Sequence, residues 1–412
     1  MNATERLYYQ DSHLTNFKAH VTALVSDERG RPAVTLNRTA FYPTGGGQPS
    51  DTGTLGAARV VECINDEASG VLHVVEGDAL RVGEEVVGSI DWPRRLEHIQ
   101  QHTGQHILSQ AFIELFGAET RGFRMMERVS EIDVALNDPT DERTERAVDL
   151  ANRIIWEDRA IRIHHVTAEQ AAAMPLRKEQ KREGHTRVIE IEGFDMNACG
   201  GTHAHRTGEV GVIAVPRWER AKGLTRVEFV AGGRALNDYR QANRTAREVA
   251  ALFSVGRDDS PASVSRLMEE NKNLLRRMRV LEEIAARVEA EELINTSVQK
   301  QSDGSRIVTH IFDGRDAESL KRLALAVASH PQSIALLGSR DGDDARLVFA
   351  RSPDATGDMG ALMREACATL NGRGGGRPDL AQGGGRNTES LRIAIEAAAR
   401  RLSEGERACA PA

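Results

Sequence analysis

Two short segments of the sequence carry side chains that can bind a metal ion. His102 and His106 stand four residues apart, and Cys199 and His203 repeat that spacing about a hundred residues later. On a helix, side chains four residues apart lie on one face roughly 6 Å from each other, so a single ion can bridge them. Three imidazoles and one thiolate suit tetrahedral Zn²⁺. The sequence therefore predicts a Zn²⁺ site built from these four residues.

The residues around this predicted site exclude two common types of hydrolase. The sequence has no Gly-x-Ser-x-Gly segment, which forms the nucleophile turn of many serine hydrolases. Thr103 stands where the His-Glu-x-x-His motif of a metalloprotease has its glutamate. His205 would share a face with His203 in an extended segment, so spacing alone leaves His205 open as a substitute ligand.

Hydrophobic periodicity predicts the elements that must position these side chains. Trp92-Pro93 predicts the start of a helix, and apolar residues at helical spacing continue it to Gly117. Segment 121–136 has the alternation of a strand hairpin, and 141–157 has the spacing of a helix. Residues 1–90 hold short β-prone segments between Gly, Asp and Pro clusters, which predicts a small β-barrel. The predicted fold class is therefore α+β, with several domains.

Two further segments complete the predicted organisation. In residues 234–300, apolar residues follow a 3-4 spacing over about four heptads, with Asn271 at the one polar seam position. This pattern predicts either a coiled-coil arm or helical hairpin, or a long amphipathic helix packed on its own domain. Residues 301–412 alternate strands and helices and include a Gly- and Arg-rich loop, 372–386. The predicted domains are 1–90, 91–233, 234–300 and 301–412.

Composition describes an ordinary soluble protein rather than a membrane protein or a disordered one. Hydrophobic residues make up 40% and charged residues 28% of the chain, and no apolar run is long enough for a spanning helix. The N-terminus lacks the features of a secretory signal, so we expect a cytoplasmic protein without a membrane partner. The formal net charge of −7 argues against a uniformly basic surface, but segments 177–187 and 217–226 are net positive. Each could bind nucleic acid or be a solvated face.

Several motifs together resemble the editing domain of alanyl-tRNA synthetase. The pair His102 and His106, followed by Cys199-Gly200-Gly201-Thr202-His203, is similar to the metal-binding motifs of that domain. Segment 37–53, which contains Thr44-Gly45-Gly46-Gly47-Gln48-Pro49, resembles its opening, and segment 202–228 resembles its close. Because the segment that resembles the editing domain begins within the first forty residues, the chain resembles a freestanding editing protein of the AlaX type in its long form. Region 91–233 is then the zinc-binding editing domain.

The resemblance implies a Zn²⁺-dependent hydrolase that acts in trans on tRNA(Ala) carrying the wrong amino acid. It would deacylate Ser-tRNA(Ala), with Gly-tRNA(Ala) as a further candidate substrate, and spare Ala-tRNA(Ala). A site that hydrogen-bonds the serine hydroxyl can discriminate better than one that relies on size, and the resemblance points to Thr120 as the partner. The sequence departs from the family at Phe123-Arg124-Met125-Met126, where a His and a small residue are more usual.

Position along the chain suggests two more polar residues for this site. Gln105, between the two histidines, could hydrogen-bond the substrate, or it could face solvent. Asn197 could orient the cysteine loop or bind the amino group of the substrate. The sequence leaves these alternatives open.

The end of the chain resembles the DHHA1 domain, and the Gly/Arg loop is its most distinctive part. Glycine N–H groups together with Arg373, Arg377 and Arg386 predict a phosphate-binding surface for tRNA. DHHA1 domains also accompany DHH phosphoesterases, but no Asp-His-His triplet precedes this one. A homodimer through the helical arm or the C-terminal domain is a further expectation. The alternative functions are a tRNA-binding module with a structural zinc and no hydrolytic activity, and a threonyl-tRNA editing protein, which shares His-x-x-x-His.

Overall fold

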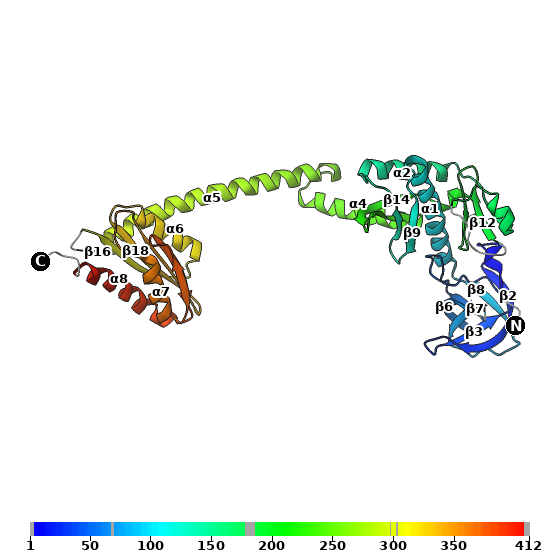
Figure 1. Cartoon of the computed structure of the whole chain (residues 1–412), viewed down its shortest axis with the longest axis horizontal. Coiled ribbons are helices and arrows are strands. Elements are labelled where there is room, and N and C mark those ends of the chain that lie inside the picture. The colour runs from blue at the N-terminus through cyan, green and yellow to red at the C-terminus, as the bar shows by residue number, and fades with distance from the viewer. Residues whose placement is uncertain (1–3, 67–69, 178–185, 297, 302–303, 408–412) are drawn as a thin grey trace. The chain divides into compact units, whose positions relative to one another are not determined.

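The computed structural model of the chain forms two compact units, Met1–Arg257 and Asp258–Ala412 (Figure 1). The expectation of an α+β chain with several domains is confirmed. None of the helices in the described part of the chain has the length and apolar character needed to cross a bilayer. Most of segment 177–187 lies outside the described residues, which are 4–66, 70–177, 186–296, 298–301 and 304–407.

The first unit begins with six strands that pair antiparallel in a closed ring, in the order β2-β3-β7-β6-β5-β8. Alternate residues at the start of β2 are buried, because successive side chains of a strand point to opposite faces. The buried set, Phe17, Ala19 and Val21, packs with Leu36 and Phe41 in the core of the ring. The strands are β2 (Asn16–Ser26), β3 (Pro32–Leu36), β5 (Gly53–Leu55), β6 (Ala58–Asp66), β7 (Gly70–Glu76) and β8 (Glu85–Ile90).

A short N-terminal segment lies against this ring. Strand β1 (Glu5–Arg6) pairs in parallel with β4 (Arg38–Thr39), and the 3₁₀ turn η1 (Leu7–Tyr9) follows β1. Tyr8 of this turn is fully buried, which anchors the segment.

The predicted histidine helix is confirmed as α1 (Trp92–Phe116). Pro93 stands in its first turn, where a missing N–H does no harm, and Gly117 ends it in the left-handed conformation with φ 62°. The helix packs beside α2 (Asp141–Trp156) and shares a core with an antiparallel sheet of order β14-β15-β10-β9. The predicted hairpin in 121–136 is confirmed as the pair β9–β10. The strands are β9 (Thr120–Met125), β10 (Ser130–Val134), β14 (Ile213–Ala221) and β15 (Leu224–Ala231).

A second, smaller antiparallel sheet carries the chain to the cysteine loop. Its order is β11-β12-β13, and the short helix α3 (Ala168–Ala172) follows β11 with a capping box between Thr167 and Gln170. The strands are β11 (Ile161–Val166), β12 (Thr186–Ile191) and β13 (Asp195–Ala198), and the 3₁₀ turn η2 (Thr207–Val210) comes after the loop.

Segment 234–300, predicted as one helical region, is divided between the two units. Helix α4 (Gly233–Leu252) belongs to the first unit, and η3 (Arg257–Asp259) spans the boundary. Helix α5 (Ser260–Thr296) belongs to the second unit, where its last turns join the core through Ala290, Leu293 and Ile294. The 3-4 seam does not take part in that packing, and its large apolar residues are exposed: Val264, Leu267, Leu274, Met278, Leu281 and Val288.

The second unit is built on a six-stranded sheet of order β16-β17-β18-β19-β21-β20. Strands β17 and β18 are parallel and are joined by α6, whereas the other pairs are antiparallel. Side chains of β18 alternate between two cores: Ile334 and Leu336 face α7 and α8, and Ala335 and Leu337 face α5 and α6. The elements are β16 (Val298–Lys300), β17 (Arg306–Asp313), α6 (Ala317–Ala328), β18 (Ser333–Asp341), β19 (Asp344–Arg351), α7 (Met359–Thr369), β20 (Arg373–Gly376), β21 (Leu380–Gly385), η4 (Thr388–Ser390) and α8 (Leu391–Arg407).

The Gly/Arg segment 372–386 is not the loop that the sequence predicts. It forms the hairpin β20–β21, with β20 at the edge of the sheet. Helix α7 lies directly on this hairpin, and a Cβ at Gly374 or Gly383 would come within 2.6 or 2.4 Å of the Cys367 Sγ. The glycines are therefore explained by the close approach of a helix to a strand pair, which sequence alone could not distinguish from a flexible loop.

Candidate metal centre

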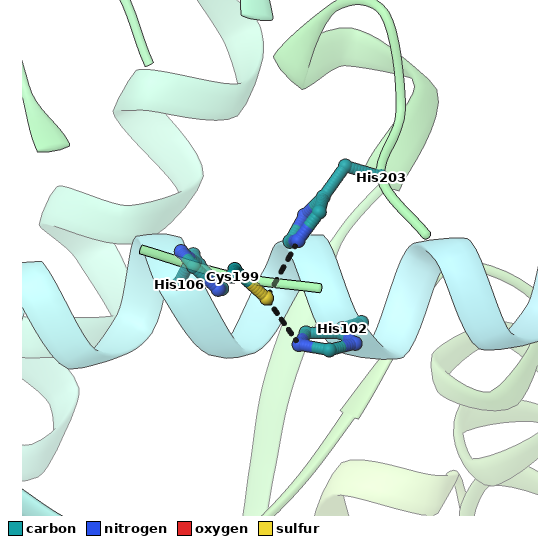
Figure 2. A group of neighbouring side chains, drawn as sticks. All are labelled: His102, His106, Cys199 and His203. Carbon is teal, nitrogen blue, oxygen red and sulfur yellow. Dashed lines mark hydrogen bonds between the residues drawn. The ribbon is translucent and has the colours of Figure 1, made fainter. Parts of the chain in front are cut away.

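Four side chains converge where α1 meets the cysteine loop (Figure 2). His102 and His106 project from consecutive turns of α1, and Cys199 and His203 come from the loop after β13. One ligand-type atom of each residue lies within 4.8 Å of the others. The Cys199 Sγ is 3.4 Å from the His102 Nε2 and 3.3 Å from the His203 Nε2. This group could hold a metal ion, and its donors are compatible with zinc.

The outer nitrogen of each imidazole has a partner of its own. The His102 Nδ1 lies 2.7 Å from the Gln48 Oε1, and the His106 Nδ1 lies 3.2 Å from a carboxylate oxygen of Asp195. Both oxygens can only accept here, so each Nδ1 carries the proton and each Nε2 keeps its lone pair. The His203 Nδ1 lies 3.4 Å from the Thr103 hydroxyl. Such outer partners fix ring orientation at metal sites.

The glycine-rich turn before Gln48 delivers that residue to the site. Gly45 and Gln48 exchange backbone hydrogen bonds of 3.0 and 2.9 Å, which closes a tight turn. Gly47 adopts φ +83°, and a Cβ there would lie 2.7 Å from the Phe123 carbonyl oxygen. Only glycine allows this turn to approach β9 so closely. The turn's contribution is therefore to place the Gln48 side chain between His102 and the cysteine loop.

The cysteine loop is held in place by a buried arginine and by the absence of a side chain at Gly201. Arg187, which is 8% exposed, donates through Nη1 to the carbonyl oxygens of Cys199 and Gly201 at 2.8 and 2.9 Å. Its Nε donates to the Tyr9 carbonyl oxygen at 3.1 Å. A Cβ at Gly201 would lie 2.1 Å from the His102 Cε1, so any larger residue would push that ring away.

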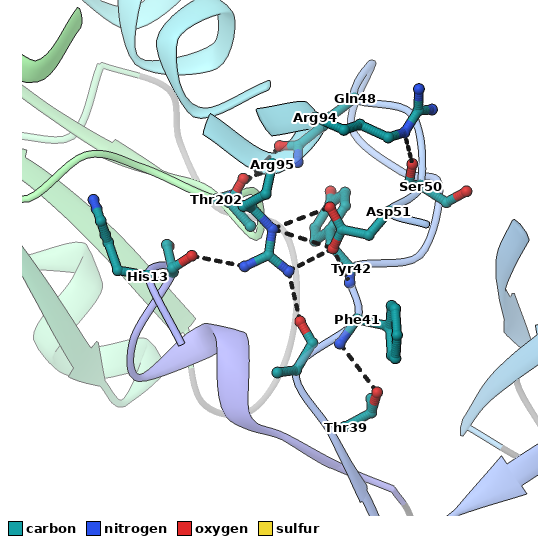
Figure 3. Close-up of polar contacts among 12 residues, drawn as sticks. His13, Thr39, Phe41, Tyr42, Gln48, Ser50, Asp51, Arg94, Arg95 and Thr202 are labelled. Carbon is teal, nitrogen blue, oxygen red and sulfur yellow. Dashed lines mark hydrogen bonds and ion pairs between the residues drawn. The ribbon is translucent and has the colours of Figure 1, made fainter. Parts of the chain in front are cut away.

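A buried ion pair connects α1 to the segment that precedes strand β5 (Figure 3). Arg95 and Asp51 are both fully buried, and the Arg95 Nε donates to the Asp51 Oδ1 at 3.0 Å. The remaining guanidinium nitrogens donate to the carbonyl oxygens of Ser12 and Ala40 at 2.7 and 2.6 Å. The Tyr42 backbone N–H donates to the same carboxylate. The position of the Gln48 turn relative to His102 thus depends on this network.

The four residues perturb each other's protonation. Burial opposes ionisation of the Cys199 thiol, but the charges of His102 and His203 and the histidine hydrogen bonds outweigh it, and the pKa of the thiol falls well below its ordinary value. Burial also lowers the pKa of His203 well below its usual value. Burial opposes protonation of His106, but the hydrogen bond to Asp195 together with the hydrogen bond and charge of Cys199 outweighs it, and the pKa of His106 is raised. A thiolate among imidazoles is the state in which these groups bind a cation.

The other predicted site residues fall into two places. Gln105 and Thr120 are buried and meet at Ser109, whose Oγ accepts from the Gln105 Nε2 at 2.8 Å and from the Thr120 hydroxyl at 2.7 Å. The alternative of a solvent-facing Gln105 is therefore wrong. Asn197 is a buried residue of β13, in register with Ile189 of β12.

His205 lies outside the four-residue group. Its Nε2 is 3.2 Å from the Asp11 Oδ1, and its ring stacks on His13 with centroids 3.9 Å apart. The chain is not a regular strand at this point, so the rule that alternate residues share a face does not apply.

Gln48, Asp195 and Arg187 are the neighbours of the group that sequence reasoning did not single out. Gln48 stands within the opening motif, and that motif could have identified it. Asp195 and Arg187 have no spacing relation to the histidines, and only the tertiary structure reveals them.

The predicted phosphate-binding arginines of the second unit, Arg373, Arg377 and Arg386, are all exposed on or beside the hairpin β20–β21. Arg377 forms an ion pair with Asp379 at 3.1 Å.

Three family models match parts of the chain. The Threonyl and Alanyl tRNA synthetase second additional domain matches residues 186–228, which include Cys199 and His203. The DHHA1 domain matches residues 303–404, and the model for class II (A) tRNA synthetases matches residues 2–94.

Curated relatives match over nearly the whole chain. The alanine–tRNA ligase of Pyrococcus abyssi is 31% identical over 95% of this chain and 43% of its own length. Those of Pyrobaculum neutrophilum and Methanothrix thermoacetophila are each 33% identical, over 92% and 96% of this chain and 42% and 44% of their own lengths. The chain thus spans less than half the length of these relatives.

A solved structure, the C-Ala domain of Aquifex aeolicus alanyl-tRNA synthetase, is 27% identical and covers 26% of this chain and 99% of its own, with a TM-score of 0.25. The sequence matches suffice: this chain is an AlaX-like relative of the editing and DHHA1 domains of alanyl-tRNA synthetase.

Proposed function

We propose that this chain is a zinc-dependent deacylase that removes serine from Ser-tRNA(Ala) and spares Ala-tRNA(Ala), with Gly-tRNA(Ala) as a second substrate. The observation that carries the proposal is the convergence of three imidazoles on one thiol group, each ring having one nitrogen next to a polar partner outside the group. This convergence occurs partly within the segment that matches the synthetase additional domain.

In this proposal His102, His106, Cys199 and His203 hold the zinc ion. Zinc supplies Lewis acidity toward an ester carbonyl or a bound water. Gln48 and Asp195 hold the rings of His102 and His106 in orientation, and Arg187 holds the loop that carries the thiolate. Asn197 binds the amino group of the substrate or orients the cysteine loop from β13.

Selection of serine is assigned to the buried hydroxyl group of Thr120. The Thr120 O–H is directed to Ser109, so its oxygen retains lone pairs that can accept from a substrate hydroxyl. Gln105 donates to the same Ser109 oxygen. Alanine has no hydroxyl, so an alanyl group would gain no such bond.

The remaining parts of the chain are proposed to handle tRNA(Ala) and assembly. With domain boundaries at residues 90, 233 and 300, the first two domains would hold the acceptor end of the tRNA. The exposed arginines Arg373, Arg377 and Arg386 would contact tRNA phosphates. The exposed apolar seam of α5 fits a homodimer in which two copies of this helix form a coiled coil.

One observation favours a second candidate. Four protein ligands are typical of a closed structural zinc site, whereas catalytic sites usually keep one position for water. The second candidate is therefore a tRNA-binding module with a structural zinc. A threonyl-tRNA editing activity is a nearer alternative, because the matching family model spans both synthetases.

The deciding experiment measures release of serine from Ser-tRNA(Ala) by the zinc-loaded chain, with Ala-tRNA(Ala) and Ser-tRNA(Thr) as parallel substrates. Fast release from Ser-tRNA(Ala) alone, lost in Cys199→Ala and in Thr120→Val, supports the proposal. Equal release from Ser-tRNA(Ala) and Ala-tRNA(Ala) removes the selectivity but keeps the deacylase. Preferential release from Ser-tRNA(Thr) supports the threonyl alternative, and no release from any substrate supports the structural-zinc module.

A further inference from the structure

One face of α4 carries three arginines that no sequence motif singled out. Arg240, Arg244 and Arg247 follow a spacing of four and three residues, which places them on one side of the helix over about two turns. Together with Asn243, Glu248 and Ala251 they line an open hollow of about 570 Å³.

Among the described residues these guanidinium groups form no ion pair, although Glu248 lines the same hollow. All three arginines are exposed, and within the described residues none takes part in an ion pair or a side-chain hydrogen bond. This contrasts with Arg234 at the start of the same helix, which is buried and pairs with Glu97 at 2.7 Å. A cluster of three unpaired cations on a chain of net charge −7 is a local positive site, and its complement is an anion with several charges.

The spread of the three arginines favours a polymer of phosphates over a single small anion. Seven residues of helix separate Arg240 from Arg247, which is roughly 10 Å, too far for one phosphate group to bridge. Guanidinium groups are suited to phosphate oxygens. Tyr239, the residue before Arg240, is 60% exposed and offers an aromatic surface of the kind on which bases stack.

We propose that the α4 arginine face, Arg240, Arg244 and Arg247, binds the phosphodiester backbone of the RNA substrate. The inference rests on the proposed function, because it assigns the contact to a tRNA whose 3′ end lies at the candidate metal centre. Helix α4 is fixed to α1 by Arg234, which also donates to the Met126 carbonyl oxygen at 2.7 Å. The arginines lie roughly 9 to 20 Å farther along α4, within the same compact unit as His102 and His106. The three arginines would therefore hold the tRNA backbone at a distance from the reacting 3′ end.

The test is the salt dependence of binding an unacylated tRNA(Ala) transcript. Glutamine replaces all three arginines, since it keeps helix propensity and removes the charge. The matched control is Arg364→Gln/Arg392→Gln/Arg400→Gln, which makes the same change in net charge on exposed residues of α7 and α8 in the second unit. Zinc content and circular dichroism of both variants report whether the fold is intact.

Each lost phosphate contact lowers the slope of log K against log salt concentration by about 0.7 to 0.9. We expect the α4 variant to lose about 2 to 3 from this slope and to bind roughly tenfold more weakly or worse. The control variant should keep the wild-type slope. An unchanged slope in the α4 variant, or an equal loss in the control, overturns the proposal.

The outcome is separable from that of the proposed function. Wild-type chain that releases serine while the α4 variant keeps its slope contradicts only the α4 assignment. Wild-type chain that binds tRNA through α4 but releases nothing contradicts only the deacylase. Wild-type chain that neither binds the transcript nor releases serine overturns both.

Discussion

Replacing Gln48 by leucine should weaken the proposed zinc binding without changing any of the four proposed ligands. The Gln48 Oε1 accepts from the His102 Nδ1 at 2.7 Å and from the Thr202 backbone N–H at 3.2 Å, and its Nε2 donates to the Thr202 hydroxyl at 2.8 Å. Leucine cannot make any of these three bonds. His102 would then lose the partner that fixes its orientation, and the cysteine loop would lose its tie at Thr202.

Loss of an outer partner of a metal-binding histidine typically lowers metal affinity by about 10- to 100-fold. This corresponds to about 1.4 to 2.7 kcal/mol of binding free energy. The assay is a competition between the protein and a chromophoric chelator for Zn²⁺ at neutral pH. Gln48→Glu is the conservative variant, because a carboxylate still accepts from the His102 Nδ1, and we expect it to retain wild-type affinity.

Gln101→Leu is the matched control for this prediction. Gln101 is as buried as Gln48, and its amide exchanges two hydrogen bonds of 2.9 Å with the backbone of Ala231, away from the four-residue group. It should lower stability but leave zinc affinity within about twofold of wild type. If Gln48→Leu binds zinc as tightly as wild type, or if Gln101→Leu loses as much affinity, the assigned role of Gln48 is refuted.

Three further predictions concern the fold. Burial lowers the pKa of His73 from 6.5 to about 4, so between those pH values the unfolded chain takes up a proton and the folded chain does not. The free energy of unfolding should therefore fall as pH drops from about 6.5 to about 4, by about 3.5 kcal/mol for a difference of 2.5 at about 1.4 kcal/mol per pH unit. Urea unfolding of the ring should show this loss in wild type and a flatter profile in His73→Asn; parallel profiles would contradict it. Gly383→Ala should destabilise the second unit by about 1 to 3 kcal/mol, because the new methyl group would overlap the Cys367 Sγ. Gly375→Ala on the same hairpin is the control and should be nearly neutral, because a methyl group there has no atom within 4 Å. Hydrogen exchange of β18 and α7 measures both variants, and equal effects would refute the packing argument. If the α5 seam is the dimer interface, Leu274→Glu together with Leu281→Glu should convert the dimer to a monomer in sedimentation equilibrium. A charged residue in place of the exposed Leu252 of α4 should leave the dimer intact. A monomeric wild type would rule out the dimer.

Local patterns in the sequence were enough for the elements that carry the candidate site. The start of α1 at Trp92-Pro93 and its end at Gly117 follow from residues whose backbone preferences act over one or two neighbours. The grouping of His102 and His106 with Cys199 and His203 was accessible because helical spacing and motif resemblance agree on it.

Other features could not be predicted from the sequence, because their causes lie in distant parts of the chain. The glycines of 372–386 look like a loop until α7 is seen to rest on them, since a close approach between elements leaves no periodicity in either one. The α4 arginines gained significance only when their lack of ion pairs among the described residues became visible.

The sequence by itself determined the donor set, the helix that presents half of it and the family to which its motifs relate. The tertiary structure decided which oxygen atoms face the outer imidazole nitrogens, that His205 turns away to Asp11, and that Thr120 and Gln105 share Ser109. Residue type and spacing constrain what a side chain can bind. Which partner it has depends on loops whose ends are fixed by contacts far away in the chain, such as the buried pair of Arg95 and Asp51.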